Sequence, residues 1–180
     1  MESIVLEKVA TEEFTVQVAE AGDVIEAFYI TKVLMNHLLK NNAIHPDLFI
    51  DTYETLKRYE ESKTLFILKR NSISLGILTM DEKEPEEFKN ISWESSGTAC
   101  FYISRIYVLP AWRNKGVGSS LLKFAENLAK NKGVDCIRID TTSNFEEGNL
   151  LLMKHNYRFA GNVFYNFQKT PVNCYEKRLS

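Results

Sequence analysis

The sequence predicts a domain of the mixed α/β class, in which one central sheet carries helices packed on its faces. Three observations favour this class. Strand-like and helix-like segments alternate along the chain, two strand-like segments flank a tight turn at Asn71 and Ser72, and a further strand leads through a glycine-containing loop into an amphipathic helix. At 180 residues, 44% of them hydrophobic, residues 1–180 are expected to form one domain with a substantial core.

The first half of the chain is expected to supply strands, two helices and a hairpin. Alternating apolar residues predict the strands, and apolar residues spaced by three or four predict the helices. The ranges are strands at 4–9, 14–18, 64–70 and 73–80, and helices at 21–41 and from 46 to about 61. An acidic segment, 81–97, then breaks the pattern. It is either a solvated connection or a surface that attracts a cationic acceptor.

The second half contains the longest predicted strand and the clearest amphipathic helix. Pro110 cannot donate to a strand ladder, so the strand should end there, and Gly133 should end the helix. The ranges are strands at 101–108, 136–141, 158–167 and 172–179, and helices at 117–130 and 145–155.

The loop before the helix at 117–130 has the composition of a phosphate site. It contains Arg113-Asn-Lys-Gly-Val-Gly118. The first turn of the helix offers unpaired N–H groups and the positive end of the helix dipole, equivalent to ~0.5 of a charge. Gly116 and Gly118 would let phosphates approach those amides, and Arg113 and Lys115 add positive charge. A simple turn with exposed basic residues has the same composition, whereas the Walker and dinucleotide spacings are absent.

The order of strand, loop and helix resembles the acetyl-CoA site of the GCN5-related N-acetyltransferases, the GNAT family. The resemblance rests on Val108-x-Pro110 followed by Arg113-x-x-Gly116-x-Gly118. Further along, the run Leu151-Leu-Met-Lys-His-Asn-Tyr157 is similar to the family's Leu-Tyr-Glu-Lys-x-Gly-Phe segment. The resemblance implies a single GNAT-like α/β (α+β) domain with a mixed, mostly antiparallel sheet and helices on both faces.

The resemblance also implies the site residues. The amide of Ile106 would face the acetyl carbonyl and stabilise the oxyanion, and the amide of Val108 would face the pantetheine arm. The residues expected to bind the coenzyme are Ile106, Tyr107, Val108, Arg113, Asn114, Lys115, Gly116, Val117, Gly118, Ser119, Asn144 and Asn149. Asn144 could equally cap the following helix.

Two positions depart from the family pattern. Leu152 stands where many members carry the tyrosine that protonates the leaving thiolate. Tyr102 stands where some members carry a glutamate, and it is a candidate catalytic residue although a phenol with a pKa near ~10 is a poor base. His155 is expected on the protein surface, and Ser119 is expected to have no base beside it.

The function implied is transfer of the acetyl group of acetyl-CoA to an amine of a small molecule or peptide, by direct attack in a ternary complex. Two alternatives stay open: a sensor that binds acyl-CoA without turnover, and an acyltransferase for hydroxyl acceptors or longer acyl chains. The acceptor pocket would be built from the first helices and the acidic segment, including His37, Asn41, Asn42 and His45. Its partners would be acetyl-CoA and the acceptor, and the resemblance allows a homodimer.

Composition and cysteine usage argue against nucleic-acid-binding, membrane-spanning and metal-binding proteins. A net charge of −2 gives no electrostatic footprint for nucleic acid, and no apolar run reaches the ~20 residues of a membrane span. Cys100, Cys136 and Cys174 lie far apart in apolar segments, so buried thiols are expected. With the histidines also scattered, no metal site is expected. These features and the lack of a signal peptide favour a reducing, cytoplasmic setting.

Overall fold

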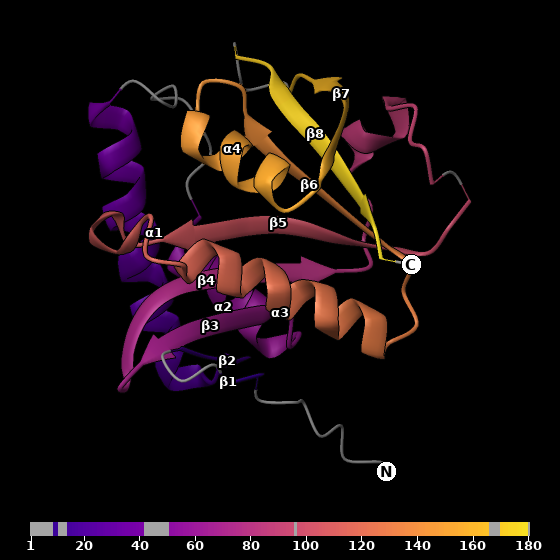
Figure 1. Ribbon diagram of the computed structural model, residues 1–180. Helices are drawn as coiled ribbons and strands as arrows, with labels where there is room; N and C mark the ends of the chain where they lie inside the picture. The colour runs from indigo at the N-terminus through magenta and orange to yellow at the C-terminus, as the bar shows by residue number, and fades with distance from the viewer. Residues whose placement is uncertain (1–8, 11–13, 42–50, 96, 166–169, 180) are drawn as a thin grey trace.

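The computed structural model describes residues 9–10, 14–41, 51–95, 97–165 and 170–179, which form one eight-stranded mixed sheet with helices on both faces (Figure 1). The strand order is β1-β2-β3-β4-β5-β6-β8-β7. All the neighbouring pairs are antiparallel except β5 and β6. The predicted fold class is therefore confirmed.

The strands and helices follow the predicted order. The strands are β1 (Val9–Ala10), β2 (Thr15–Val18), β3 (Leu65–Arg70), β4 (Ile73–Asp81), β5 (Cys100–Val108), β6 (Cys136–Thr142), β7 (Arg158–Val163) and β8 (Val172–Arg178). The helices are α1 (Val24–Lys40), α2 (Tyr53–Glu61), α3 (Val117–Asn131) and α4 (Glu146–Lys154), with short 3-10 turns η1 (Ala21–Asp23), η2 (Glu86–Asn90) and η3 (Pro110–Trp112). No helix in this described part of the chain has the length and apolar character of a membrane span.

The helices cover the sheet in two layers. Helix α3 lies in front of the central strands and α4 in front of β6 and β8, whereas α1 and α2 lie behind the sheet (Figure 1). The apolar face of α3, including Leu121, Leu122 and Ala125, is fully buried against the sheet. Ile30 of α1 and Leu56 of α2 are buried in a second cluster on the opposite face. Burial of these two apolar layers fixes which side of each strand faces which helix.

Some predicted boundaries differ from those in the structure. The predicted strand at 4–9 lies almost entirely outside the described residues, as does the part of the predicted second helix before Asp51. The described helix α2 begins at Tyr53, because the Thr52 side chain accepts a hydrogen bond from the Thr55 amide (3.2 Å) and caps the first turn. The tight turn is confirmed: Asn71 and Ser72 both have positive φ, as a two-residue hairpin requires.

The two halves of the sheet meet at a short parallel seam between β5 and β6. Their pairing runs only from Cys100 with Cys136 to Ile103 with Ile139. After Ile103, a register shift in the pairing with β4 leaves Ser104 as an extra residue, which is a β-bulge. From there β5 continues beside β4 alone, and the space between β5 and β6 opens.

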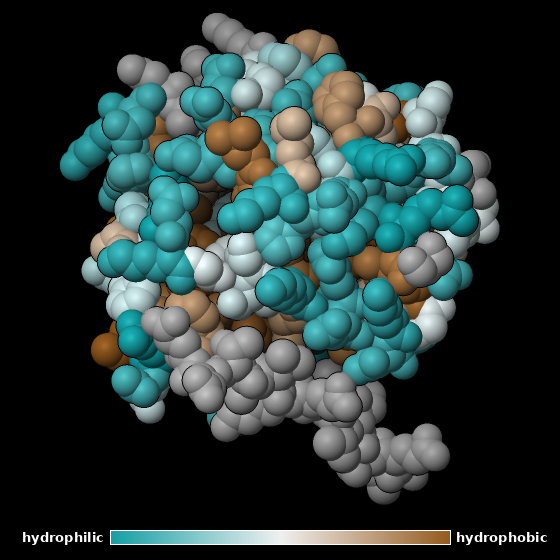
Figure 2. All heavy atoms as spheres, in the orientation of Figure 1, coloured by the Kyte–Doolittle hydropathy of each residue, from teal (hydrophilic) through white to brown (hydrophobic). Residues whose placement is uncertain are grey.

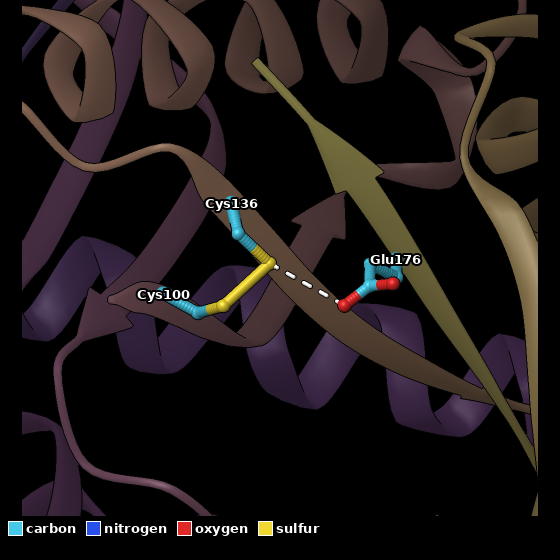
Figure 3. Close-up of side chains that lie close together, drawn as sticks. All are labelled: Cys100, Cys136 and Glu176. Carbon is cyan, nitrogen blue, oxygen red and sulfur yellow. Dashed lines mark hydrogen bonds between the residues drawn. A yellow bond between two sulfur atoms is a disulfide. The ribbon is translucent and has the colours of Figure 1, made fainter. Parts of the chain in front are cut away.

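The expectation of three free thiols is wrong. Cys100 and Cys136 form a disulfide (Figure 3). Cys174 is the free, buried cysteine of the described residues. The two cysteines are 36 residues apart in sequence but are direct register partners on β5 and β6, with their Cα atoms 4.4 Å apart. The distance along the sequence did not reveal the pair, because parallel strands are joined by a crossover. The reducing setting inferred from free thiols loses its basis.

Reducing this disulfide is expected to lower the free energy of unfolding by about 3–4 kcal/mol, because the cross-link restricts the unfolded chain. Urea unfolding of the wild type with and without a thiol reductant measures the change. Cys136→Ala should unfold alike in both conditions, whereas the control Cys174→Ala should keep the wild-type response to reductant. If the urea midpoint of the wild type were the same with and without the reductant, the result would contradict the cross-link.

The acidic segment is more structured than a solvated connection. Buried Arg138 of β6 forms ion pairs with Glu84 (3.1 Å) and with Glu176 of β8 (3.2 Å), and it donates to the carbonyl of Ser95 (3.1 Å). The Trp93 ring stacks on its guanidinium, 4.4 Å away. These contacts hold the segment against the sheet, where part of it lines the cavity described below.

Candidate active site

A cavity of about 920 Å³ opens where β5 and β6 separate. Its walls come from α1, the acidic segment, β5, the loop before α3, β6 and α4. Hydrophilic side chains cover most of the α3 side of the molecule, and a few exposed apolar side chains lie over α4 (Figure 2). The cavity itself has both polar and apolar lining residues, among them Arg113, Asp140 and Leu152.

The backbone of β5 presents two amides to this cavity. The amide of Leu109 donates to the carbonyl of Leu75 on the β4 side (3.0 Å). In an antiparallel ladder successive residues point their N–H groups to opposite sides, so those of Ile106 and Val108 point away from β4. Ile106 lies opposite Leu78 and Val108 opposite Gly76, beyond the last residue pair with β6. Both amides thus face the opening between the strands, as the proposed oxyanion and pantetheine contacts require.

The loop before α3 forms a concave set of donors. Gly116 is the residue before the helix and has a φ of +85°, a left-handed conformation that favours glycine. The helix geometry leaves the amides of Val117, Gly118 and Ser119 without intrahelical acceptors. Arg113, Asn114, Gly116, Gly118 and Ser119 line the cavity.

Arg113 is the charged group that best fits a pyrophosphate. Its guanidinium stacks over the Phe145 ring, with 5.0 Å to the ring centroid, and lies 3.6 Å from a Glu147 oxygen. The side chain is 14% exposed, and its buried Nη2 has no hydrogen-bond partner among the described residues. An unpaired buried donor is costly unless a ligand satisfies it. A phosphate oxygen of coenzyme A would supply that acceptor.

Three residues of this region, Val117, Gly118 and Lys115, have surroundings that the sequence did not predict. Gly118 was expected to leave room for phosphates, but a Cβ there would point at α4 and meet Leu151 Cδ2 at 2.9 Å. Val117 has its side chain in the core, 1% exposed, so only its amide is available to a ligand. Lys115 is exposed and its ammonium lies 5.1 Å from the Trp112 ring centroid. Glycine at 118 thus lets α3 and α4 approach closely.

The two asparagines do not lie where the pantetheine arm is expected, and neither lines the cavity. Asn149 donates to the carbonyls of Thr142 (3.0 Å) and Phe145 (2.7 Å), and its Oδ1 accepts from Asn173 and from the Tyr175 hydroxyl (each 2.7 Å). Its amide is fully used in holding the β6–α4 connection. The residue before α4 is Phe145, so exposed Asn144 does not cap the helix either.

The positions that depart from the family pattern lie in the cavity wall. Leu152 is 1% exposed and packs in the main core, with part of its surface toward the cavity. Tyr102 accepts a hydrogen bond from Arg138 (3.3 Å). Burial raises the pKa of the Tyr102 hydroxyl above its ordinary value, against the opposing effect of Arg138. Tyr102 is therefore ionised even less at neutral pH than an ordinary phenol, which makes it an unsuitable general base.

Asp140 is a candidate catalytic residue that the sequence reasoning missed. It is the first residue of β6 beyond the seam, it lines the cavity, and its Oδ2 accepts a hydrogen bond from the Tyr165 hydroxyl (2.6 Å). Burial raises the pKa of the Asp140 carboxyl, although the Tyr165 bond opposes this. A carboxylate with a raised pKa at the strand opening suits a proton acceptor. The signal in the sequence was an acidic residue, Asp140, inside a segment predicted to be a buried strand, 136–141.

His155 is a second missed residue, since it was expected at the surface. It follows α4 and is partly buried, and its Nε2 lies 2.9 Å from the Oγ of Ser119 in the first turn of α3. The close packing of Leu151 on Gly118 brings these two helix ends together. Ser119 therefore does have an imidazole beside it.

The arrangement of potential metal ligands also differs from the expectation. Among the described residues, one group of three such side chains lies close together: Cys100, Cys136 and Glu176, whose ligand atoms are all within 4.8 Å (Figure 3). In this structure the two sulfurs are bonded to each other, and Glu176 is held by Arg138 (3.2 Å) and the Ser95 amide (3.1 Å). The group lies where the β5–β6 pairing begins, at the end of the seam away from the cavity.

Comparison with known proteins agrees with the fold. The model of the acetyltransferase (GNAT) family matches residues 32–157, which is more than half of the chain. The chain therefore belongs to the GNAT family of acetyltransferases. No curated protein sequence matches it.

Solved structures show the same fold at low sequence identity. A GNAT-family acetyltransferase from Streptococcus agalactiae is 13% identical with a TM-score of 0.78, over 92% of this chain and 95% of that one. One from Listeria monocytogenes is 17% identical with a TM-score of 0.75, over 96% and 100%. The yncA protein of Salmonella typhimurium, whose structure contains its cofactor acetyl-CoA, is 18% identical with a TM-score of 0.65, over 93% and 95%.

Proposed function

We propose that this protein transfers the acetyl group of acetyl-CoA to a primary amine, by direct attack within a ternary complex. The observation that carries the proposal is the cavity itself. The amides of Ile106 and Val108 face it from β5, and it is also lined by the first turn of α3 and by Arg113, whose Nη2 is unpaired. This spacing of donors fits a long ligand with phosphates at one end and a thioester at the other.

Different residues of the cavity have different proposed roles in binding and catalysis. The amides of the α3 first turn and Arg113 hold the pyrophosphate, and the Val108 amide holds the pantetheine arm. The Ile106 amide donates to the carbonyl oxygen as negative charge develops there. Loss of one such donor in other enzymes costs roughly 3 kcal/mol of transition-state stabilisation.

Asp140 is the proposed base. The neutral amine nitrogen attacks the thioester carbon, the C–S bond breaks, and the proton that leaves the nitrogen passes to the Asp140 carboxylate. The thiolate departs and takes a proton from water, because Leu152 has none to give. No covalent intermediate with the protein forms in this scheme.

The acceptor side of the cavity favours a cationic amine. Asp81, Glu84 and Glu86 of the acidic segment line it together with Lys83 and with Asp140 of β6. Glu84 is already paired with Arg138 (3.1 Å), so the proposal depends mainly on Asp81, Glu86 and Asp140. Arg105 also lines the cavity, but its guanidinium is engaged by buried Asp51 through two hydrogen bonds of 2.8 Å each. These carboxylates would attract an ammonium ion. Its first proton is lost to water to give the neutral amine that attacks, and Asp140 then receives the proton that leaves the nitrogen after attack.

Two measurements test the proposal. Calorimetry should show that coenzyme A binds, and thiol release from acetyl-CoA should require an added acceptor, with polyamines preferred over acidic peptides. Mass spectrometry of protein incubated with acetyl-CoA alone should find no acetyl adduct, and acetylated Ser119 would contradict direct attack. Longer acyl donors and hydroxyl acceptors in the same panel test the broader acyltransferase reading.

A sensor domain is the second candidate, and the leucine at position 152 is the observation that favours it. Binding of coenzyme A without turnover across the whole acceptor panel would support the sensor. Acceptor-dependent release would exclude it.

Leu152→Tyr is expected to change single-turnover acetyl transfer by no more than a few-fold, because a thiolate leaves readily without an acid. The substitution should also lower the free energy of unfolding, since the added hydroxyl enters a site that is 1% exposed. Rapid-quench kinetics and urea unfolding measure the two effects. Leu152→Phe is the matched control for ring size. A gain of several hundredfold specific to tyrosine would mean that the natural protein lacks an acid it needs.

A further inference from the structure

The contact between His155 and Ser119 joins α4 to the phosphate-binding turn of α3, and the proposed mechanism does not use it. Ser119 lies in the first helical turn and lines the cavity, so its hydroxyl is beside the unpaired amides. His155 is not a cavity-lining residue, and it reaches the site through its Nε2, 2.9 Å from Ser119 Oγ.

The direction of this hydrogen bond decides what Ser119 can offer a ligand. If Nε2 carries no proton, the serine hydroxyl donates to the imidazole and has no proton left for a phosphate oxygen. If Nε2 carries a proton, the imidazole donates to Oγ and the hydroxyl proton is free to turn toward the cavity. A pyrophosphate accepts hydrogen bonds and offers no donor, so it binds only the second arrangement well.

We propose that His155 is a positioning residue for the coenzyme: its Nε2–H donates to Ser119 Oγ and so directs the serine hydroxyl proton toward the pyrophosphate. The inference rests on the proposed function, because it places the pyrophosphate against the first turn of α3. It gives His155 a role in affinity for coenzyme A, with no part in the acetyl transfer itself.

The surroundings of His155 make this contact sensitive to pH. Burial lowers the pKa of the imidazole, so the free protein holds it mostly neutral near pH 7. The charged groups that act on it are Glu126 and Lys123 from α3, Lys177 from β8 and Lys154 beside it in the chain. Glu126 is engaged by Lys177 (2.8 Å). A bound pyrophosphate adds negative charge on the Ser119 side, which raises the pKa of His155 and favours its doubly protonated form, in which Nε2 donates.

The rise in the pKa of His155 on binding determines how the affinity for the coenzyme changes with pH. Because the bound state holds the proton more tightly than the free state, affinity is highest below the pKa of the free protein. It falls as pH rises through the interval between the two pKa values and is flat above it. Dephospho-CoA is the probe for this measurement, because it lacks the 3′-phosphate, whose own second ionisation near pH ~6 would add to the profile.

A double-mutant cycle tests the proposal directly. We expect His155→Leu and Ser119→Ala each to weaken coenzyme A binding about tenfold, as removal of a hydrogen bond to a charged group does. The double variant should bind no more weakly than Ser119→Ala, because His155 acts only through the serine. Additive losses, or a His155→Leu protein that binds like the wild type, would overturn the proposal.

His155→Gln keeps the test decisive if the leucine variant folds poorly. Its amide nitrogen can donate to Oγ at every pH, so we expect binding within about twofold of the wild type and no pH dependence for dephospho-CoA between pH 6 and 8. The wild type should lose several-fold in affinity over the same range. Equal profiles for the two proteins would overturn the proposal.

A histidine elsewhere supplies the control, and the wild type separates the two hypotheses. His37 was expected in the acceptor pocket, but in the structure it contacts Asn41 on α1 and does not line the cavity. His37→Leu should therefore leave coenzyme affinity and its pH profile unchanged. A wild type that fails to bind coenzyme A would overturn the proposed function and this inference with it. A wild type that binds, together with His155 variants that bind alike, would overturn this inference alone.

Discussion

Gly118→Glu is expected to weaken coenzyme A binding by more than a hundredfold. The new side chain would bring a carboxylate to the first turn of α3, where the proposed pyrophosphate receives its hydrogen bonds, and like charges repel strongly there. Its Cβ would also meet Leu151 Cδ2 at 2.9 Å, so α4 would shift away from α3. Isothermal titration calorimetry measures the loss.

Two further variants separate charge from packing. Gly22→Glu makes the same substitution at an exposed glycine whose added Cβ would meet no atom within 4 Å, and it should bind coenzyme A like the wild type. Gly118→Glu combined with Leu151→Ala relieves the steric contact but keeps the carboxylate, so its affinity should stay low. Undiminished binding by the Gly118→Glu protein would place the phosphate site elsewhere.

Asp140→Asn should lower the rate of acetyl transfer by a factor of about 10²–10⁴, with coenzyme affinity nearly unchanged. The factor is the usual contribution of a positioned general base. An amide cannot accept the proton that leaves the attacking amine, but it retains the size of the carboxyl and can still accept the hydrogen bond from Tyr165. Pre-steady-state kinetics at saturating acetyl-CoA measures the rate without interference from binding.

The pH profile gives a second readout of Asp140. Because burial raises its pKa above the ordinary range and the base must be ionised, kcat/KM should rise with pH through that raised pKa and then level off. The Asp140→Asn protein should lose this acidic limb. Asp135→Asn, an exposed aspartate between α3 and β6, is the control and should keep both the rate and the profile. An Asp140→Asn protein with wild-type kinetics would remove Asp140 from the mechanism.

The fold was predictable because each strand and helix carries its own local signal. The Asn71 and Ser72 turn, the apolar stripe of α3 and the left-handed Gly133 after it all depend on neighbours in sequence, and the structure has them where predicted. The pairing of Cys100 with Cys136 depends on how two distant strands align, and sequence periodicity does not report register. The free-thiol expectation was wrong for that reason.

The same distinction between local sequence signals and long-range contacts applies to the residues of the site. The loop at 113–118 was predictable, because glycines, basic residues and a helix start follow one another directly in sequence. The contacts of Asp140 with Tyr165 and of His155 with Ser119 join segments 25 and 36 residues apart, and no periodicity relates them. Asn149 was misjudged because its type suits a pantetheine contact, while the packing of α4 on β6 and β8 uses both ends of its amide.

The short β5–β6 seam has a mechanical consequence. Among the described strands, β1 to β5 form one antiparallel unit and β6, β8 and β7 form another, joined by four residue pairs with the disulfide across the first. The rest of the line between the units is the cavity. The two units are therefore joined directly at one end of the line between them, and a ligand that bonds to Ile106 and Val108 adds contacts at the other end. At a hundred times its dissociation constant, such a ligand would raise the free energy of unfolding by about 2.7 kcal/mol.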